Sequence, residues 1–339
     1  MSAVKIFSRM TAVWLACMAA LFMASAAIAQ SADSAKPRVK IRFVSTLSSA
    51  TFPISYAVEN GIFAKRGLDV EMLNFADFQA VYTAMRTSAA DMGSGGLASV
   101  INLRGNGVPV NVIWGTSLML NDILVKPGSG IKSPSDLRGK DIGVFGGASG
   151  TTANMFIATL TDQFGFDPRK DAKIRYGAPT LLSNMLANGD IAAFVSNDPM
   201  TAVELASGRA ISIGELGAIY AKNHNGYHPY AGALTVSDQF GREHPEAVNA
   251  FLGAWNESVK LLQASPALWQ PLLNKQMKID DPVAADLLMK RFTPLWTSTW
   301  TKANVDGEIE ALKYMNKTAG KGFLEKIPDD AFDLKFKPK

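Results

Sequence analysis

The chain has 339 residues, of which 47% are apolar, and its formal net charge is +4. So small a positive charge, without a basic stripe, argues against a nucleic-acid-binding surface. The apolar fraction is that of a globular chain, and the length allows two domains of ordinary size.

The first 29 residues have the pattern of a cleavable export signal. Lys5 and Arg9 form a basic segment, residues 10–23 form an almost uncharged apolar core, and residues 27–29 read Ala-Ile-Ala, a typical cleavage site. The apolar stretch is short for a membrane span. Cleavage would lower the net charge from +4 to +2, because two cations and no acid would leave. We therefore expect an exported protein of a bacterial periplasm.

In the first half of the chain, apolar segments with strand and helix patterns alternate. The alternation of apolar and polar residues at 39–45 is typical of a strand, and Ser94-Gly95-Gly96 is interpreted as a turn before a helix. Such an order predicts parallel strands with helices on both faces of a sheet. Strands are expected at residues 39–45, 68–73, 91–93 and 108–115, and helices at 53–59, 78–87 and 97–104.

The second half repeats this plan, and residues 185–208 have the same order of elements as residues 85–107. Two further apolar strands, 122–125 and 230–236, connect the halves, and the tail beyond them is mostly helical. Strands are expected at 141–145, 172–176, 191–196 and 210–213, and helices at 151–164, 179–187, 200–206, 245–264, 267–276, 282–292 and 305–318.

This order predicts an α/β fold with two lobes joined by a two-strand hinge. We expect residues 38–125 and 231–339 to form lobe 1, with the helical C-terminal segment packed on it, and residues 126–230 to form lobe 2. In an open sheet of parallel strands, a ligand binds at the carboxyl ends of the strands. A cleft between two hinged lobes at those ends is the predicted binding site.

The strongest candidate for ligand contact is the turn at residues 146–152. A short strand ends in two glycines, and Ser149, Thr151 and Thr152 then open a helix, with Gly147 inside the turn. Hydroxyls and free backbone N–H groups at a helix N-terminus suit an oxyanion, although the same residues can simply cap the helix. No Gly-Lys-Ser/Thr follows, so the turn is not a P-loop, and Thr151 breaks the G-x-S-x-G pattern of hydrolases.

Other polar turns and aromatic residues are expected around the same cleft. Glycines at the end of a strand allow a ligand to approach the backbone closely, and aromatic rings near a hinge can form the walls of a pocket. Each of these residues could instead have a purely structural role, in a tight turn, as a helix cap or in packing. The helix cap is the main alternative for Asp198. These candidates are Ser48, Thr51, Phe52, Ser94, Gly95, Trp114, Asn197, Asp198 and Tyr230.

Catalytic and metal-binding patterns are weak. His224, His228 and His244 lack metal-ligand spacing, and Cys17, the single cysteine, lies inside the export signal. A triad of Ser149, Asp198 and His228 would have an allowed chain order but the wrong nucleophile turn. We expect no enzyme activity, no metal and no cofactor, and we interpret the tryptophans of the tail as packing.

Four stretches with Asp198-Pro199 together resemble one family, the periplasmic solute-binding proteins of ATP-binding-cassette importers. The branch that they resemble most handles sulfonates, taurine, nitrate and thiamine-pyrimidine precursors. The stretches are ENGIFAKRGLDVE at 59–71, ADMG at 90–93, SPSDLRGKDIGV at 133–144 and LANGDIAA at 186–193.

The resemblance implies two Rossmann-like lobes, that is, the type II periplasmic binding protein fold, with one ligand closed between them. It implies a small organic anion as ligand, an inner-membrane permease as partner, no nucleic acid, and a monomer. Fungal enzymes of the superfamily use a histidine and a cysteine cluster, which a mature chain without cysteine lacks. An exported hydrolase or lyase on this fold and a periplasmic ligand sensor stay open as alternatives.

Overall fold

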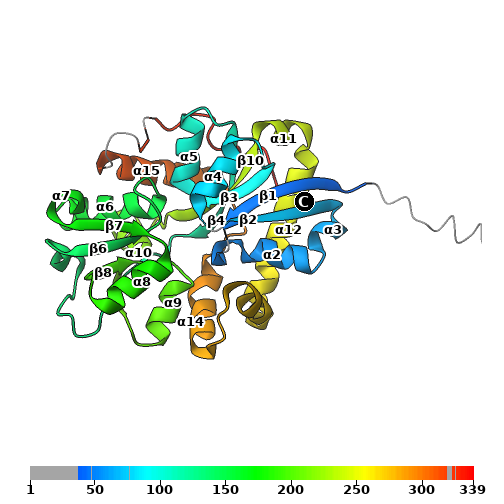
Figure 1. The fold of residues 1–339 in the computed structure, drawn as a ribbon. Coiled ribbons are helices and arrows are strands. Elements are labelled where there is room, and N and C mark those ends of the chain that lie inside the picture. Colours follow the sequence, from blue (N-terminus) through cyan, green and yellow to red (C-terminus); the bar gives the residue numbers. More distant parts are fainter. Residues whose placement is uncertain (1–36, 47, 76, 319–322, 325) are drawn as a thin grey trace, which may run out of the picture. The chain divides into compact units, whose positions relative to one another are not determined.

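The computed structural model describes residues 37–46, 48–75, 77–318, 323–324 and 326–339. The expected export signal at 1–29 lies outside the described residues. Val39–Lys339 forms one compact unit, which contains two five-stranded sheets with helices packed around them (Figure 1). The predicted α/β class with two sheets is confirmed.

The first sheet has the strand order β2-β1-β3-β10-β4, and we call this sheet with its helices the first lobe. β1 pairs in parallel with β2 and β3, whereas β10 runs antiparallel to β3 and β4. The carboxyl ends of β1 and β3 therefore lie at the same edge. The strands are β1 (Val39–Thr46), β2 (Leu68–Phe75), β3 (Met92–Gly96), β4 (Val110–Leu118) and β10 (Tyr230–Ser237).

The expected turn at Ser94-Gly95-Gly96 is wrong, because these residues are the last three of strand β3. Gly95 pairs with Ala233 of β10, and Gly96 pairs with Gly232. Two consecutive glycines are typical of a turn. They belong to a strand here because they pair with β10, a segment far along the chain.

The second sheet has the order β7-β6-β8-β5-β9, and this sheet with its helices is the second lobe. β6 pairs in parallel with β7 and β8, and β5 runs antiparallel to β8 and β9. Both sheets are thus mixed, not wholly parallel as expected. The strands are β5 (Asp122–Val125), β6 (Asp141–Phe145), β7 (Lys173–Gly177), β8 (Ala193–Val195) and β9 (Ile211–Glu215).

Strand β5 corrects the expected lobe boundary. We assigned residues up to 125 to lobe 1, but β5 pairs only with strands of the second sheet. The chain therefore passes from the first sheet to the second at residues 119–121, and it returns at residues 224–229, before β10.

Helices follow the strands in most connections. In the first lobe they are α2 (Phe52–Glu59, preceded by the 3-10 turn Ser49–Thr51), α3 (Ile62–Lys65), α4 (Phe78–Arg86) and α5 (Leu97–Gly105). In the second lobe they are α6 (Thr151–Gln163), α7 (Pro168–Asp171), α8 (Pro179–Asn188), α9 (Met200–Ala206) and α10 (Leu216–Asn223), with a 3-10 turn at Pro134–Leu137. The tail has α11 (Asp238–Glu243), α12 (Pro245–Ala264), α13 (Gln270–Leu272), α14 (Pro282–Phe292) and α15 (Lys302–Thr318), with short helical turns at Pro266–Trp269, Leu273–Met277 and Thr293–Leu295.

The C-terminal segment packs on both lobes, not on the first alone. α12 contacts α2 and α3 of the first lobe, as expected, and Phe251 of α12 stacks on Phe43 of β1 with ring centroids 5.4 Å apart. α14, however, packs on α9 and α15 packs on α6, which are helices of the second lobe. The segment therefore bridges the two sheets beside the chain crossings.

The tryptophans of the tail are buried, which confirms that they serve packing. Trp269 and Trp296 stack with ring centroids 4.3 Å apart, and Phe52 meets Trp269 edge to face. Trp255 and Trp300 are also almost inaccessible to solvent. Across the part of the chain that the structure describes, no helix combines the length and the apolar character that a membrane crossing needs.

Candidate functional site

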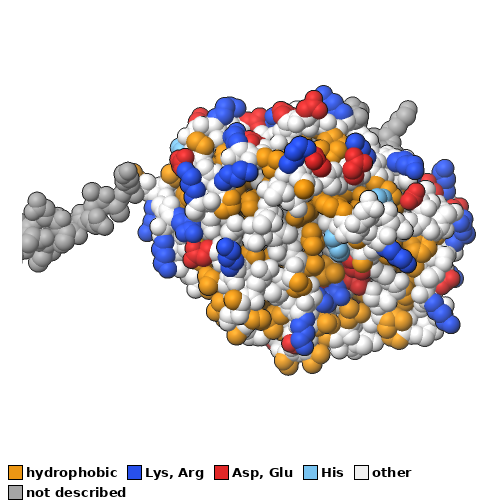
Figure 2. All heavy atoms as spheres, turned by 180° about the vertical axis from the view of Figure 1, so that it is seen from behind, with side chains coloured by type: hydrophobic (Ala, Val, Ile, Leu, Met, Phe, Trp, Pro, Cys, Tyr) orange, Lys and Arg blue, Asp and Glu red, His pale blue; other side chains and the backbone are white. Residues whose placement is uncertain are grey.

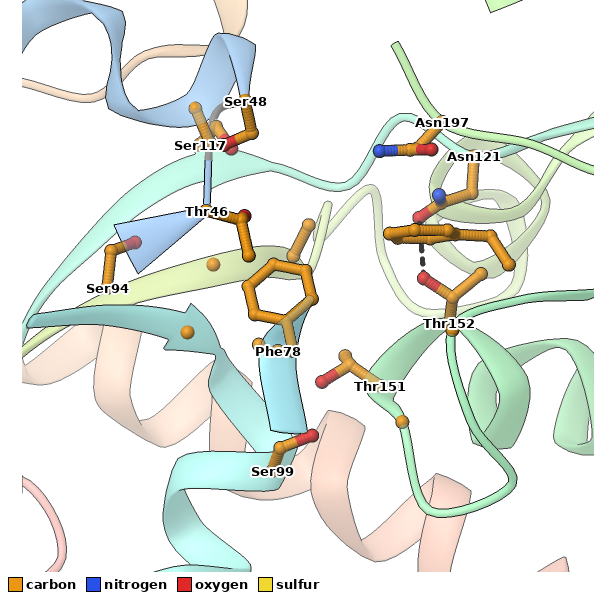
Figure 3. A pocket seen from close by; sticks show the side chains of 18 of the residues that line it. Thr46, Ser48, Phe78, Ser94, Ser99, Ser117, Asn121, Thr151, Thr152 and Asn197 are labelled. Atoms are coloured by element: carbon orange, nitrogen blue, oxygen red, sulfur yellow. Dashed lines mark hydrogen bonds between the residues drawn. The ribbon is translucent and has the colours of Figure 1, made fainter. Parts of the chain in front are cut away.

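A cavity of about 140 Å³ lies between the two sheets, where the ends of β1 and β3 face the start of α6 (Figure 3). Its volume compares with that of an engineered cavity of about 150 Å³ that binds benzene. The chamber therefore accommodates a group about the size of one six-membered ring. A second cavity of about 650 Å³, the outer compartment, shares part of this lining, and its own lining includes Asp77, Pro179, Met200 and Met277.

The first lobe lines the chamber with hydroxyl groups. Thr46 ends β1, Ser48 follows it, Ser94 lies in β3, Ser99 lies in the first turn of α5, and Ser117 lies near the end of β4. In Figure 3, Thr46, Ser48, Ser94 and Ser117 lie together on one side of the cavity. A hydroxyl can donate one hydrogen bond and accept others, so this wall can bind an oxygen-rich group.

The second lobe contributes the N-terminus of α6. Gly146 has a φ of +85°, which the left-handed region allows to glycine at little cost, and it turns the chain from β6 toward the helix. Asn154 Nδ2 donates to the carbonyl oxygen of Gly150 at 2.8 Å and so holds the loop on the helix. The first N–H groups of a helix have no partner inside it, and they carry the positive end of the helix dipole.

Thr151 brings an unsatisfied hydroxyl to this helix end. Its side-chain oxygen is buried and has no hydrogen-bond partner among the described residues, and the residue is only 6% exposed. A Cβ added to Gly96 of the first lobe would lie 2.8 Å from that oxygen. The two lobes therefore approach closely here because position 96 has no side chain.

Aromatic side chains form the apolar wall of the chamber. Phe78 of α4 stacks on Tyr82, and it meets Phe145 of β6 edge to face across the lobes, with ring centroids 6.4 Å apart. The Tyr82 hydroxyl accepts a hydrogen bond from the Gly96 N–H at 3.1 Å. Burial raises the pKa of Tyr82, so its hydroxyl stays neutral and available as a hydrogen-bond group.

Asp198 lies against the chamber but is held by protein groups. It accepts a hydrogen bond from the Ala202 N–H at 3.0 Å, as a helix cap does, and pairs with Arg291 Nε at 3.2 Å. Arg291, from α14, also pairs with Asp122. Burial raises the pKa of Asp198 to about 6, although the nearby guanidinium opposes that shift. Asp198 therefore binds the first turn of α9 through the Ala202 N–H, as the helix-cap alternative expected, and it also lies in the chamber lining.

Most of the predicted site residues meet at this chamber. Nine of them line it: Ser48, Ser94, Gly95, Gly147, Ser149, Thr151, Thr152, Asn197 and Asp198.

Four predicted residues lie elsewhere. The Thr51 hydroxyl faces the backbone oxygens of Thr46 and Ser48, to which it can donate, and Phe52 packs against Trp269. Trp114 is buried and donates its indole N–H to the Thr297 carbonyl oxygen, so it packs against the C-terminal segment. Tyr230 packs edge to face on Trp300, and its hydroxyl accepts from Asn304.

The sequence analysis missed several residues that line the chamber, and only some of them stand at positions that indicate a binding site. Thr46 and Ser117 stand at or near the ends of strands, which is where side chains reach such a cleft. Phe78 and Tyr82 have ordinary helix periodicity, so nothing in the sequence separates them from core residues. Asn121 lies in the short connection between β4 and β5. It lines the chamber only because the two sheets pack together there, which the sequence does not show.

The charge around the chamber is unusual for an anion site. Among the described residues that line the chamber and its outer compartment there is no lysine, arginine or histidine. Nor do the described residues contain a group of three or more metal-ligating side chains close enough to hold an ion. On the face shown in Figure 2, lysine and arginine side chains are scattered among acidic, apolar and other side chains.

A family model described as "NMT1/THI5 like" matches residues 49–268, which is more than half of the chain. The chain belongs to the NMT1/THI5-like family. Curated relatives of this NMT1/THI5-like protein include the 4-amino-5-hydroxymethyl-2-methylpyrimidine phosphate synthase of Schizosaccharomyces pombe, 25% identical over 230 residues, or 63% of each chain. The synthase THI13 of Saccharomyces cerevisiae is 25% identical over 68% of this chain and 69% of its own. The chain thus spans less than two thirds of the length of the first of these relatives.

Solved structures with the same fold include proteins described as sulfonate-binding or nitrate-binding. The alkanesulfonate-binding protein SsuA from Xanthomonas axonopodis pv. citri, bound to MOPS, has a TM-score of 0.69 at 16% identity, covering 84% of this chain and 95% of its own. The periplasmic aliphatic sulphonate-binding SsuA from Escherichia coli has a TM-score of 0.69 at 19% identity, covering 85% and 95%. The nitrate-binding NrtA from Synechocystis PCC 6803 has a TM-score of 0.61 at 16% identity, covering 75% and 70%. The predicted resemblance and the binding-protein fold are confirmed.

Proposed function

We propose that this NMT1/THI5-like protein is the substrate-binding component of an ATP-binding-cassette importer. In this proposal it works in the periplasm as a monomer, captures a small organic anion (a sulfonate or a carboxylate) by hinge closure, and presents it to an inner-membrane permease. It releases the ligand unchanged, in contrast to the synthases among its relatives.

One observation carries the proposal. The N-terminus of α6 in the second lobe and the hydroxyl-bearing ends of β1 and β3 in the first lobe face each other across one chamber. A ligand that contacts both lobes favours the closed arrangement, because only there can it make all its contacts. Helix N–H groups and hydroxyls can hold an oxyanion without a salt bridge.

The proposed contacts come from both lobes. Ser48, Ser94 and the backbone of Gly95 would hold the ligand from the first lobe, and the turn from Gly147 through Thr152 would hold it from the second. The hydroxyl of Thr151, which is buried and has no partner among the described residues, would donate to the oxyanion. Phe78 and Phe145 would contact the carbon skeleton.

The test is to identify the ligand and to show that it closes the cleft. Mass spectrometry of the natively purified protein identifies a co-purified molecule, and thermal-shift screening of sulfonates and carboxylates extends the search. A ligand at about 100 times its dissociation constant should stabilise the protein by about 2.7 kcal/mol. Small-angle scattering should show a smaller radius of gyration when the ligand is present.

Thr151→Val is the informative variant, since valine has nearly the shape of threonine but no hydroxyl. Loss of one hydrogen bond to a charged group should weaken binding by about 1.5–3 kcal/mol, or roughly ten- to a hundredfold. The proposal fails if no organic anion stabilises the protein. It also fails if a bound anion leaves chemically altered.

A further inference from the structure

The chamber and the outer compartment share part of their lining, and the shared residues mark where the two cavities meet. Residues 149–152, at the start of α6, line only the chamber, whereas Pro179, Met200 and Met277 line only the outer compartment. Among the described residues that line both, Phe78 and Phe145 have the only aromatic side chains, and the others are polar residues or glycines. The boundary between the two cavities is therefore formed largely by two phenylalanine rings.

The two rings belong to different lobes and meet across the cleft. Phe78 is the first residue of α4 in the first lobe, and Phe145 is the last residue of β6 in the second. Their planes are inclined by 67°, an edge-to-face contact, and both side chains keep partial exposure. Figure 3 shows the ring of Phe78 pointing into the cavity. Such a contact stabilises the approach of two aromatic rings beyond the effect of the area that it buries.

Phe78 is held in place by its own lobe. Asp77 caps α4 by accepting a hydrogen bond from the Ala80 N–H at 3.0 Å, which fixes the backbone beside Phe78. Behind the ring of Phe78 lies Tyr82, with ring centroids 6.0 Å apart, and the Tyr82 hydroxyl is itself bound by the Gly96 N–H. The ring of Phe78 therefore moves with the first lobe.

Phe145 is held in the same way by the second lobe. It pairs with Gly177 of β7, and the following N–H, of Gly146, donates to the Gly177 carbonyl oxygen at 3.1 Å. Its ring packs against an apolar cluster of the second lobe that includes Leu182 and Phe194. Since each ring is fixed within its own lobe, the separation of the rings follows the separation of the lobes.

We propose that the aromatic pair Phe78–Phe145 determines the length of ligand that the site retains. The rings meet behind a short anion whose head lies at the α6 N-terminus, and a long anion holds them apart. This rests on the proposed function and deepens it. Volume alone does not set such a limit, because the chamber of about 140 Å³ is followed by an outer compartment of about 650 Å³ with apolar side chains in its lining.

Ligands that share a head group and differ in length test this inference. Benzoate is compared with 4-butylbenzoate, and ethanesulfonate with octanesulfonate, because only the short member of each pair is small enough for the chamber. Isothermal titration calorimetry gives the dissociation constants, and stopped-flow tryptophan fluorescence gives the dissociation rates. The quantity of interest is the dissociation constant of the long member divided by that of the short member.

Phe145→Ala should lower this ratio by about two- to tenfold, the range that corresponds to one edge-to-face contact. The short member should dissociate faster from the variant, whereas the long member should bind as tightly as before or more tightly. Phe78→Ala, in the other lobe, should have the same effect, and the double variant should add little, since loss of either ring breaks the contact.

A matched control comes from the neighbouring strand. Tyr176 of β7 is 36% exposed and lines neither cavity, so Tyr176→Ala removes an aromatic ring of the same sheet and should leave the ratio unchanged. Circular dichroism and melting curves show whether each variant folds. If an alanine variant does not fold, the corresponding leucine variant, which also lacks the ring, takes its place.

The outcomes separate this inference from the proposed function. If both members of a pair bind and the variants weaken them by the same factor, the rings only stabilise the site, and the inference is overturned while the proposed function stands. Independent effects of the two substitutions in the double variant would also overturn it, because the rings would then not act as a pair. If no member of either pair binds, the proposed function fails and the inference fails with it.

Discussion

The clearest test of the architecture is the removal of Arg291, the cation that joins α14 to the second sheet. Its side chain is 18% exposed, and it pairs with Asp122 and Asp198. Arg291→Met keeps much of the apolar stem but leaves two buried carboxylates facing each other without a cation. Such an uncompensated buried charge is among the few changes that destabilise a protein strongly.

The expected loss is about 3–5 kcal/mol in the free energy of unfolding, which is the usual cost of removing one partner from a buried ion pair. The loss should depend on pH in a defined direction. The pKa of Asp198 in the folded protein is raised to about 6 from its ordinary value of 3.8, so its ionisation costs stability as pH rises through 6. Loss of the guanidinium raises that pKa further, so the variant should be destabilised more at pH 8 than at pH 5.

Urea unfolding followed by tryptophan fluorescence measures this effect, and the neighbouring residue supplies a control. Lys290 pairs with Asp286 on the exposed side of α14, with side chains 72% and 56% exposed. Lys290→Met should change stability by less than about 1 kcal/mol, because exposed ion pairs contribute little. If Arg291→Met is as harmless as Lys290→Met at pH 8, the cluster does not hold α14 on the second lobe and the reasoning is wrong.

Two further predictions concern buried groups and the approach of the lobes. Glu308 accepts hydrogen bonds from the Tyr227 hydroxyl and the Tyr230 N–H, and burial raises its pKa from 4.5 to about 8. The free energy of unfolding should therefore fall between pH 4.5 and 8, by on the order of 5 kcal/mol, and melting curves of Glu308→Gln should lose this slope. Gly96→Ala should leave the fold stable but weaken ligand binding at least severalfold, because its Cβ would lie 2.8 Å from Thr151 Oγ1 when the lobes are close; unchanged affinity by calorimetry would refute this steric account.

Much of the fold could be predicted because its signals are local. The strand at Val39–Thr46 and the helix at Pro245–Ala264 both follow from apolar periodicity and the residues that bound them. The errors concern pairing between distant segments. Asp122–Val125 was placed in the first lobe because one aspartate and three apolar residues do not indicate which sheet the strand joins. Ser94-Gly95-Gly96 read as a turn because its partner strand lies about 140 residues further along the chain.

The candidate site also contains some residues that local sequence could predict and others that it could not. The helix opening at Thr151 was predictable because glycines followed by hydroxyls have a direct physical meaning at a helix N-terminus. The aromatic candidates Trp114 and Tyr230 do not line the chamber, because the direction of a strand side chain depends on register, and register is set by the neighbouring strands. Arg291 was beyond prediction, since its partners lie 93 and 169 residues away.

Among the described residues, the lining of the chamber includes no lysine, arginine or histidine, so the proposed anion would be held there by dipoles. Helix N–H groups and hydroxyls are dipoles, and they bind best where water is largely excluded and the local dielectric constant is low. A lysine or arginine in the chamber would pair with Asp122 or Asp198 when the cleft is open and would have to leave them to bind the ligand. The structure instead pairs those acids with Arg291, which lies outside the chamber lining, and Asp198, which does line the chamber, is held by Arg291 and the Ala202 N–H. Binding of the proposed anion would then break no ion pair of the Arg291 cluster, and its contacts with both lobes would favour the closed state.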